Sequence, residues 1–431
     1  MTGSAGERRV SRALVIVEDG GWRDLRPLTD LLPVPALAFG ASTLWERWRR
    51  AAGVPLLAIE ARPESMRAWR ETPSPDATRL TAHDPVLVVN AAALPGPWLE
   101  SEASDEALFV AGGRFVAARL DFETAARGLG RGAEFERFLL GLSLPAVEAE
   151  APRIERPWHF VEWNAAAIEQ DLGGRAGAIA GERHPLAAVL QPERVTVEPG
   201  ARIDPFAVLD ARGGPIRIGP RAIVGSHTVV TGPCVVGAGT QLLGGAVGRS
   251  TIGPECRIAG EVEECVWQGY ANKRHHGFVG HSVVGEWANL GALTTTSDLK
   301  NNYGPVRVWV DGRDEQSGVS KIGSFVGAHV KTGIGTLLPT GASIGVGSNL
   351  FGGGRFAPKH VPAFAWWDGE RLDEHRLDAF LATARIAMGR RGRELTPADE
   401  AALRVVFAAT AGEREAASGV TSALTPPQLR P

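Results

Sequence analysis

The chain has 431 residues, of which 44% are hydrophobic and 22% are charged, and its formal net charge is −3. This length suggests about three structural units, and the composition is typical of a folded protein rather than a disordered one. The charge argues against nucleic acid as a partner, no apolar run is long enough to span a bilayer, and the first one is too short for a signal peptide. We therefore expect a cytoplasmic protein without membrane segments.

Residues 1–142 alternate short apolar runs with amphipathic stretches. Runs at 13–17, 54–59 and 85–89 predict strands, and Gly112-Gly113 between two apolar segments predicts a β-hairpin. Ser42 is expected to cap a helix that ends at Ala52, and residues 134–140 predict another helix. Strands that alternate with helices predict an α/β domain with a mostly parallel sheet.

The stretch 143–157 is polar and contains prolines, which is typical of a linker. Residues 160–171 follow with the spacing of a helix whose inner side carries Val161, Ala165 and Ile168. We therefore assign residues 143–194 to a linker and a connecting helix.

From about residue 195 the period changes to six. A helix needs a period of 3.6 and an ordinary strand a period of two, so this spacing predicts a hexapeptide-repeat β-helix over 195–365 rather than a β-sandwich with regular turns. Each flat face of such a coil points one side chain inward. The expected inward residues are Val197, Ile203, Leu209, Ile218, Val224, Val230, Val236, Leu242, Ile252, Ile258, Phe278, Val284, Leu290, Val326, Thr332, Leu338, Ile344 and Leu350.

Two interruptions of the repeat, 261–277 and 294–319, are expected to be insertions that project from the solenoid as loops. The repeats stop near 365. Residues 372–388 and 397–411 are expected to be amphipathic helices, the second capped by Thr396, so that 366–431 forms a short helical tail.

Cysteine and lysine usage limits the chemistry. Cys234, Cys256 and Cys265 form no CxxC pair, so we expect buried thiols rather than a zinc site or disulfides, and no metal ligand set is recognised. The chain has five lysines, and none precedes Lys273. The first half therefore lacks a common phosphate-binding side chain.

Three stretches carry a family resemblance: GGWRDLRPLTDLLPVPALAFG, RPWHFVEWNAAAIEQDL and NKRHHGFVGHSVVGEWANLGALTTTSDLKNNYG. With them, most of residues 13–355 resembles a divergent bacterial branch of the bifunctional UDP-N-acetylglucosamine pyrophosphorylase and glucosamine-1-phosphate N-acetyltransferase family. The resemblance implies a sugar-nucleotidyltransferase-like first domain, a left-handed parallel β-helix, and a transferase that moves acetyl groups from acetyl-CoA to an amino-sugar phosphate. It also implies a homotrimer with shared active sites.

The resemblance places the catalytic base at His275, five residues before Gly280. An ammonium must lose a proton before it can attack, and histidine titrates near neutrality. His276 is adjacent and is the alternative if the register differs by one residue. The family tyrosine just after the histidine is Phe278 here.

The same motif implies the groups that hold the sugar. The family residues that bind the sugar are matched here by Asn289, Asn302 and Tyr303. Amide and phenol groups suit this role because they hold hydroxyls without titrating. Lys273 and Arg307 are the candidates for the sugar phosphate.

For acetyl-CoA, glycines in the last repeats would let backbone N–H groups approach the pantetheine arm. These are Gly327, Gly333 and Gly345, and Lys331 is the candidate for the CoA phosphates. The family serine near the thioester is replaced by Ala328.

The first domain departs further from its family. Its loop offers Asp19, Gly20, Gly21, Arg23 and Arg26 as the matching candidates for the phosphates of UTP or another NTP.

Two other positions of this domain have lost a charged side chain. Leu32 stands where the divergent branch has an arginine, and Asn90 replaces the aspartate that would hold Mg²⁺. Nucleotidyl transfer, with its Mg²⁺, is therefore expected to be weak or absent.

Three functions remain open from the sequence. The first is acetyl transfer to an amino-sugar phosphate, with or without nucleotidyl transfer. The second is a hexapeptide acyltransferase that acts on another amine. The third is a non-catalytic protein that binds a sugar nucleotide and CoA.

Overall fold

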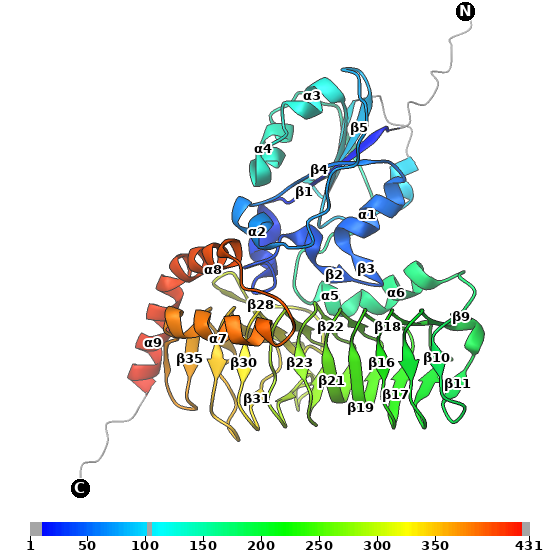
Figure 1. Ribbon diagram of the computed structural model, residues 1–431. Helices are drawn as coiled ribbons and strands as arrows, with labels where there is room; N and C mark the ends of the chain where they lie inside the picture. Colours follow the sequence, from blue (N-terminus) through cyan, green and yellow to red (C-terminus); the bar gives the residue numbers. More distant parts are fainter. Residues whose placement is uncertain (1–10, 101–105, 425–431) are drawn as a thin grey trace, which may run out of the picture. The chain divides into compact units, whose positions relative to one another are not determined.

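The computed structural model describes residues 11–100 and 106–424, which form two compact units (Figure 1). Within the described residues, the first unit comprises 11–22, 32–37 and 42–155, and the second comprises 23–31, 38–41 and 156–424. Residues 23–31 thus belong to the second unit, although they lie inside the segment expected to form the first domain.

A six-stranded mixed sheet is the centre of the first unit. Its strands lie in the order β4 (Leu56–Glu60), β1 (Ala13–Val17), β5 (Pro85–Asn90), β7 (Arg114–Asp121), β6 (Ala107–Ala111) and β8 (Ala146–Glu148). β1 runs parallel to β4 and β5, β6 runs parallel to β8, and β7 is antiparallel to both of its neighbours. The expected α/β class is confirmed, and the edge strand β8 lies in the stretch expected to be only a linker.

Local chemistry explains the ends of these elements. β6 and β7 join at Gly112 and Gly113, whose φ angles of 55° and 77° suit glycine in a tight hairpin turn. Helix α1 (Leu44–Ala52) is capped by Thr43, which forms a capping box with Glu46, and not by Ser42 as expected. The remaining helical segments of this unit are α2 (Pro63–Ala68), α3 (Phe122–Ala126), α4 (Phe135–Leu140) and 3-10 turns at Val34–Ala36, Pro97–Glu100 and Gly132–Glu134.

The second unit is a β-solenoid whose coils have three faces, as the six-residue period predicts. Its coils begin at Ala178 rather than at 195 and continue to Trp367. The first face consists of β9 (Ala178–Ile179), β12 (Val195–Val197), β15 (Ile216–Ile218), β18 (Cys234–Val236), β20 (Thr251–Ile252), β22 (Val266–Trp267), β25 (Val283–Val284), β29 (Ser324–Val326), β32 (Ala342–Ile344) and β34 (His360–Val361).

The other two faces share two long strands, β19 (Gln241–Gly248) and β21 (Arg257–Glu263), which run across the corner between them. The second face further contains β10 (Glu182–Arg183), β13 (Arg202–Ile203), β16 (Ile223–Val224), β23 (Asn272–Lys273), β30 (Lys331–Thr332), β33 (Asn349–Leu350) and β35 (Ala365–Trp367). The third face further contains β11 (Ala188–Leu190), β14 (Val208–Asp210), β17 (Thr228–Thr231), β24 (Phe278–Gly280), β26 (Thr295–Thr296) and β31 (Leu337–Leu338).

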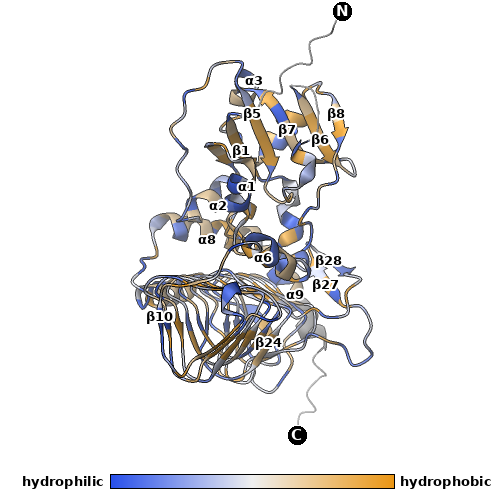
Figure 2. Cartoon of the chain, turned by 90° about the vertical axis from the view of Figure 1, so that its right-hand side faces the viewer, coloured by the Kyte–Doolittle hydropathy of each residue, from blue (hydrophilic) through white to orange (hydrophobic). Residues whose placement is uncertain are grey.

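The interior of the solenoid is a continuous apolar core, and its strands are mostly coloured as hydrophobic in Figure 2. Every residue expected to point inward is buried except Phe278, whose neighbour Val279 takes the interior position beside Val262. The frame shifts here because the coils turn at their corners with loops of unequal length. Phe278 therefore points outward, next to Asp298.

The prediction of an insertion at residues 261–277 is wrong. Residues 261–277 are not a projecting loop, because they belong to β21, β22 and β23 and complete one coil of the solenoid. The second expectation is confirmed, since the chain leaves the solenoid after β26 and returns at β29. This insertion carries the hairpin of β27 (Arg307–Val310) and β28 (Arg313–Gln316), and Leu299 pairs with Lys321 at its base.

Helices cover the solenoid at one face and at its C-terminal end. The expected connecting helix is divided into α5 (His159–Glu162) and α6 (Asn164–Leu172), and Ile168 and Leu172 of α6 pack on Val235 of the first face. After β36 (Leu372–Glu374) the tail forms α7 (Leu377–Gly389), α8 (Pro397–Ala409, capped by Thr396) and α9 (Ala411–Leu424). Further short elements are β2 (Ala38–Phe39), β3 (Ser42–Thr43) and 3-10 turns at Gly20–Leu25 and Pro192–Arg194.

All three cysteines are free and buried, as expected, and burial raises the pKa of each thiol to about 12. In the described part of the chain, no helix combines the length and the apolar character needed to cross a bilayer.

Candidate active site

The two candidate bases lie at one corner of the solenoid. Residues 274–277 connect β23 on the second face to β24 on the third, and both His275 and His276 are exposed there. The corner is tied to its neighbouring coils, because Glu261 N–H donates to the Gly277 carbonyl (3.1 Å) and Leu293 N–H donates to the His276 carbonyl (2.8 Å). The backbone that carries the two imidazoles is thus held by hydrogen bonds, and both imidazoles are exposed to solvent.

An open hollow of about 520 Å³ lies beside this corner. Small residues of successive coils line it together with Val229, and its polar lining residues are His227, Glu261 and His276. His276 lines the hollow, whereas His275 does not. A ligand in this hollow would meet two imidazoles and a carboxylate.

Lys273 does not lie where a phosphate contact was expected. Its side chain is only 1% exposed and occupies an interior position of the second face, between Ile258 and Leu290. Its ammonium donates to the carbonyls of Ala259 (2.7 Å), His275 (3.2 Å) and Gly277 (2.6 Å). Burial lowers the pKa of Lys273 from 10.5 to about 8. The ammonium therefore has three protein acceptors and does not reach the surface.

A histidine that the sequence did not single out lies at the other end of β24. His281 Nδ1 is 2.8 Å from Asp298 Oδ2, and its Nε2 is 3.5 Å from Glu264 Oε2. The hydrogen bond from His281 is the main cause that lowers the pKa of Asp298. Since Asp298 stands where the insertion leaves the solenoid, this pair fastens the base of the insertion. The signal available in the sequence was the third histidine of the quoted motif.

The sugar-binding candidates of the insertion are on its surface. Tyr303 is 74% exposed, and the Asn302 side chain accepts a hydrogen bond from Gly304 N–H, which gives it a role in the turn. Arg307 is exposed and lies 3.8 Å from Asp314. In the same chain, β24 separates these residues from the histidine corner. Its three residues correspond to about 10 Å of extended chain.

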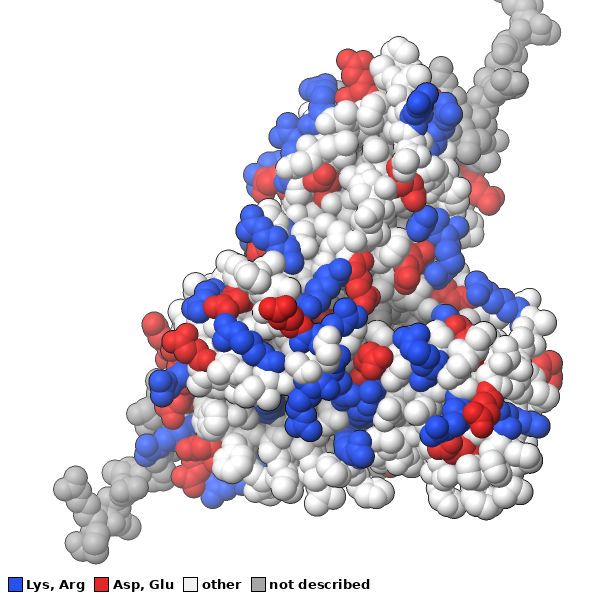
Figure 3. Space-filling view, in the orientation of Figure 1, with Lys and Arg blue, Asp and Glu red and all other residues white. Residues whose placement is uncertain are grey.

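Asn289 and Lys331 lie on the outer side of the second face. Asn272 Nδ2 donates to Asn289 Oδ1 (2.7 Å), and Asn289 pairs with Lys331 on the next coil. Burial lowers the pKa of Lys331. Figure 3 shows further basic side chains near α7 in the view of Figure 1, and Arg391, just after α7, has its pKa lowered by burial and by Arg257. Lys331 is therefore a partly buried lysine on the outer side of this face.

The glycines expected near acetyl-CoA have a structural reason. A Cβ on Gly327 would lie 2.7 Å from the backbone nitrogen of Val346, and one on Gly345 would collide with the backbone of Ala363. Close stacking of coils thus requires these glycines whether or not a ligand is bound. Gly333 lies in the next corner of the same coil as Gly327. Ala328, which follows Gly327, is partly exposed.

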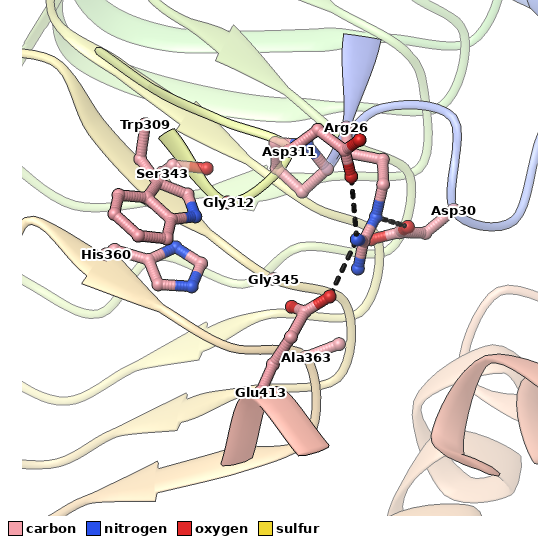
Figure 4. A pocket seen from close by; sticks show the side chains of 11 residues that line it. Arg26, Asp30, Trp309, Asp311, Gly312, Ser343, Gly345, His360, Ala363 and Glu413 are labelled. Carbon is pink, nitrogen blue, oxygen red and sulfur yellow. Dashed lines mark hydrogen bonds and ion pairs between the residues drawn. The ribbon is translucent and has the colours of Figure 1, made fainter. Parts of the chain in front are cut away.

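Arg26 lines a cavity of about 160 Å³ within the second unit (Figure 4). Its guanidinium bonds Asp30 (2.6 Å) and Glu413 (2.7 Å) and lies 3.7 Å from Asp311. Burial alone would lower the pKa of Arg26, but Asp30 and Glu413 outweigh it and raise the pKa above its usual range. Three carboxylates therefore occupy this guanidinium, which corrects the expectation that Arg26 binds a nucleotide phosphate. Arg23 is exposed in the same segment.

In the first unit, Asp19 and Asn90 form a buried network. Asp19 Oδ2 accepts from Arg153 Nη2 (2.7 Å) and from Asn90 Nδ2 (2.7 Å), and Asp19 Oδ1 accepts from Gly21 N–H (3.0 Å). The Asn90 carbonyl oxygen accepts from Ala92 N–H (2.8 Å). These side chains use their polar atoms on one another and do not present a cation site.

The other glycine of the loop is also engaged. Gly20 N–H bonds the carboxylate of Glu136, whose pKa is raised by burial and by the nearby Asp19. Carboxylates thus occupy backbone N–H groups that a phosphate would need. Among residues 11–100 and 106–424, no group of three histidine, cysteine or acidic side chains is arranged to hold a metal ion. The Mg²⁺ required for nucleotidyl transfer does not fit this loop.

Comparison with known proteins finds a family model that matches the first part of the chain. Residues 14–176 match the model of the family described as sugar nucleotidyl transferase. Within the matched residues, the loop at 19–21 is closed by carboxylates and by Arg153.

Relatives of known name match shorter stretches. The bifunctional sugar-1-phosphate nucleotidylyltransferase/acetyltransferase of Sulfurisphaera tokodaii is 37% identical over 93 residues, 22% of this chain and 23% of that protein. The bifunctional protein GlmU of Desulfitobacterium hafniense is 27% identical over 190 residues, 39% of this chain and 37% of that protein. The chain therefore spans between 23% and 37% of the length of these two relatives, and the first of them is a transferase by name.

A search of solved structures finds acyltransferases. UDP-N-acetylglucosamine acyltransferase from Campylobacter jejuni matches with a TM-score of 0.26 and 11% identity, over 55% of this chain and 94% of that one.

Proposed function

We propose that the solenoid is an acyltransferase that moves the acetyl group of acetyl-CoA to the amine of an amino-sugar phosphate in the cytoplasm. The observation that carries the proposal is the histidine corner, where His275 and His276 stand exposed beside an open hollow on a β-solenoid. The names of the bifunctional relatives, one of which includes an acetyltransferase, support the same reaction.

The chemistry needs a base at this corner. The amine nitrogen attacks the carbonyl carbon of the thioester, an N–C bond forms, and the C–S bond breaks. The imidazole takes the proton of the attacking nitrogen and returns it to the departing thiolate. We assign this role to His275 from its place in the motif, with His276 as the alternative because it lines the hollow. Asn289, Asn302, Tyr303 and Arg307 are proposed to hold the sugar phosphate.

A second copy of the chain would complete the site. The insertion with Asn302 and Tyr303 and the histidine corner lie at opposite ends of β24, so one chain does not bring them together. The corner and the adjoining third face expose large apolar side chains that a neighbour would cover, as expected for an interface between copies. They are Phe206, Val229, Leu293, Ile334, Phe351 and Phe356. We therefore propose a homotrimer with shared sites, in which Gly327, Ala328, Lys331 and Gly345 border the bound acetyl-CoA.

We propose that residues 14–176 bind a sugar phosphate or a nucleotide but do not catalyse nucleotidyl transfer. The carboxylates of Asp19 and Glu136 occupy the loop, and Asn90 is fully engaged in hydrogen bonds. Phosphate chemistry needs positive charge at the transferred group, whereas this loop gathers negative charge. This leaves the acetyl-transfer site as the reactive part of the molecule.

A thiol-release assay tests the proposal. The full chain is incubated with acetyl-CoA and a panel of amines that contains glucosamine-1-phosphate, free amino sugars and simple amines. Release of CoA with amino-sugar phosphates supports the proposal. Release only with another amine indicates a hexapeptide acyltransferase of different acceptor, and binding of CoA without release indicates a non-catalytic binding protein.

A further inference from the structure

Lys273 stands at a position where the solenoid otherwise places apolar side chains. Its neighbours along the second face are Ile258 before it and Leu290 after it, and both are buried in the core. Within the same coil the interior positions of the other faces are Trp267 and Val279. A charged group in this place carries a desolvation cost that an aliphatic side chain would avoid. The position therefore calls for a role besides packing.

The acceptors of Lys273 indicate what that role is. An ammonium has three N–H donors, and here they meet three carbonyls, of Ala259, His275 and Gly277. Two of these carbonyls lie on either side of the His276 residue, within the corner that bears the candidate bases. Ala259 belongs to β21 on the preceding coil, so the ammonium joins two successive coils from inside.

The corner has few other backbone ties. Glu261 N–H bonds the Gly277 carbonyl from the preceding coil, and Leu293 N–H bonds the His276 carbonyl from the following coil. The partner that the structure shows for the His275 carbonyl is Lys273 Nζ. Lys273 thus fixes the residue proposed as the base at its own peptide group.

We propose that Lys273 is a positioning residue that holds the corner 274–277, and with it the imidazoles of His275 and His276, from inside the solenoid. It does not touch the reacting atoms. The proposal deepens the proposed acyl transfer, on which its kinetic consequence rests, but its structural consequence is independent of any reaction.

The charge state of the ammonium supports the role. The carboxylate of Glu261, on β21, faces the ammonium and favours its protonated form, whereas the nearby thiol of Cys265, just before β22, is neutral near pH 8 because burial raises its own pKa to about 12. Burial opposes the carboxylate and lowers the pKa of Lys273 to about 8. A neutral amine has only two N–H donors, so deprotonation removes one of the three hydrogen bonds.

Substitution with a side chain of similar length tests the clamp. Lys273→Met fills the same interior space but cannot donate, and Ile258→Met is the matched control one coil away. Amide exchange is followed at Glu261 and Leu293, whose N–H groups donate to the corner. We expect at least a tenfold faster exchange at both amides in Lys273→Met and no comparable change in Ile258→Met. Equal exchange in the wild type and Lys273→Met would overturn the proposal.

Kinetics give a second and separable readout. Lys273→Met should lower kcat for acetyl transfer by about 10- to 100-fold while KM for acetyl-CoA stays within about threefold, because the base is misplaced but the cosubstrate site is intact. A raised KM for acetyl-CoA with an unchanged kcat would contradict a positioning role. If the wild type transfers no acetyl group to any amine, the proposed function fails, and the exchange rates alone decide on the clamp.

The wild type offers a test that needs no variant, in case Lys273→Met does not fold. In protein labelled with ¹⁵N-lysine, the clamp predicts one slowly exchanging ammonium signal that is lost as the pH rises through about 8. Fast exchange of all five lysine ammonium groups at neutral pH would overturn it.

Discussion

Arg153 Nη2 lies 2.7 Å from Asp19 Oδ2 inside the first unit, and both side chains are buried. Asn90, which replaces the expected metal-binding aspartate, donates to the same carboxylate oxygen. Removal of one partner of a buried ion pair leaves the other charge uncompensated, so the network resists opening. A phosphate or a metal ion that entered this loop would have to displace Arg153 or Asn90 from Asp19.

The first prediction follows for nucleotidyl transfer. With UTP or another NTP, Mg²⁺ and a sugar-1-phosphate, the full chain should release little or no pyrophosphate, because Gly20 and Gly21 already bond carboxylates. Asn90→Asp alone should not restore turnover, since the new carboxylate would still face Asp19. Pyrophosphate release at ordinary enzymatic rates by the wild type would show that this loop rearranges when the nucleotide binds.

The second prediction separates the two candidate bases. Replacing the catalytic histidine by alanine should lower acetyl transfer by about 10²- to 10⁴-fold and leave the fold intact, because both imidazoles are exposed. We expect this loss in His275→Ala and a smaller one in His276→Ala. Circular dichroism and thermal unfolding serve as controls. A crippled His276→Ala beside an active His275→Ala would move the assignment by one residue.

The sequence predicted the solenoid well because its signal is local. One inward side chain per face gives a period that survives changes elsewhere, and residues such as Val224, Val230 and Val236 are all buried as expected. The period failed at 261–277, where corners of unequal length shift the frame, so that a regular coil was taken for an insertion. It also failed at Phe278, where the interior residue is Val279.

The candidate site was harder to predict because its residues depend on contacts between coils. Lys273 was expected to bind phosphate on account of its charge, yet it stands six residues after Trp267 and six before Val279, both of which are interior. That spacing placed it inside the solenoid. The ion pairs of Arg26 could not be predicted from the sequence, because its partners Asp311 and Glu413 are far from it along the chain and approach it only in the fold.

The third prediction concerns shared sites. Chains with His275→Ala, mixed and refolded with chains blocked at the acetyl-CoA side, should regain part of the activity if neighbouring copies complete one site. Ala328→Trp is the better block, because Gly327→Trp would collide with the backbone of Val346 and disturb the coil itself. A monomer by light scattering that transfers acetyl groups at full rate would contradict the trimer.

The fourth prediction concerns Arg26 and stability. Arg26→Ala removes the guanidinium that bonds the buried Asp30 carboxylate, whose side chain is 5% exposed. Loss of one partner of such a cluster should cost about 3 kcal/mol in the free energy of unfolding. Arg307→Ala is the control, since its pair with Asp314 is 3.8 Å long and exposed and should contribute less than about 1 kcal/mol. Denaturant unfolding measures both. Equal effects would show that Arg26 does not stabilise the second unit.

The last prediction is the pH dependence that Lys273 imposes. Its pKa is about 8 in the folded chain and 10.5 when unperturbed, so between these values the unfolded chain binds more protons. Stability linked to this group therefore rises with pH over that window, by roughly 3 kcal/mol in all, because the cost of burying the charge disappears. Lys273→Met has no such group. The unfolding free energy of the wild type minus that of Lys273→Met should therefore increase from pH 8 to 10.5. Acetyl transfer by the wild type should fall over the same range as one clamping hydrogen bond is lost. A constant difference in stability across this range would show that Lys273 is not held as a buried ammonium.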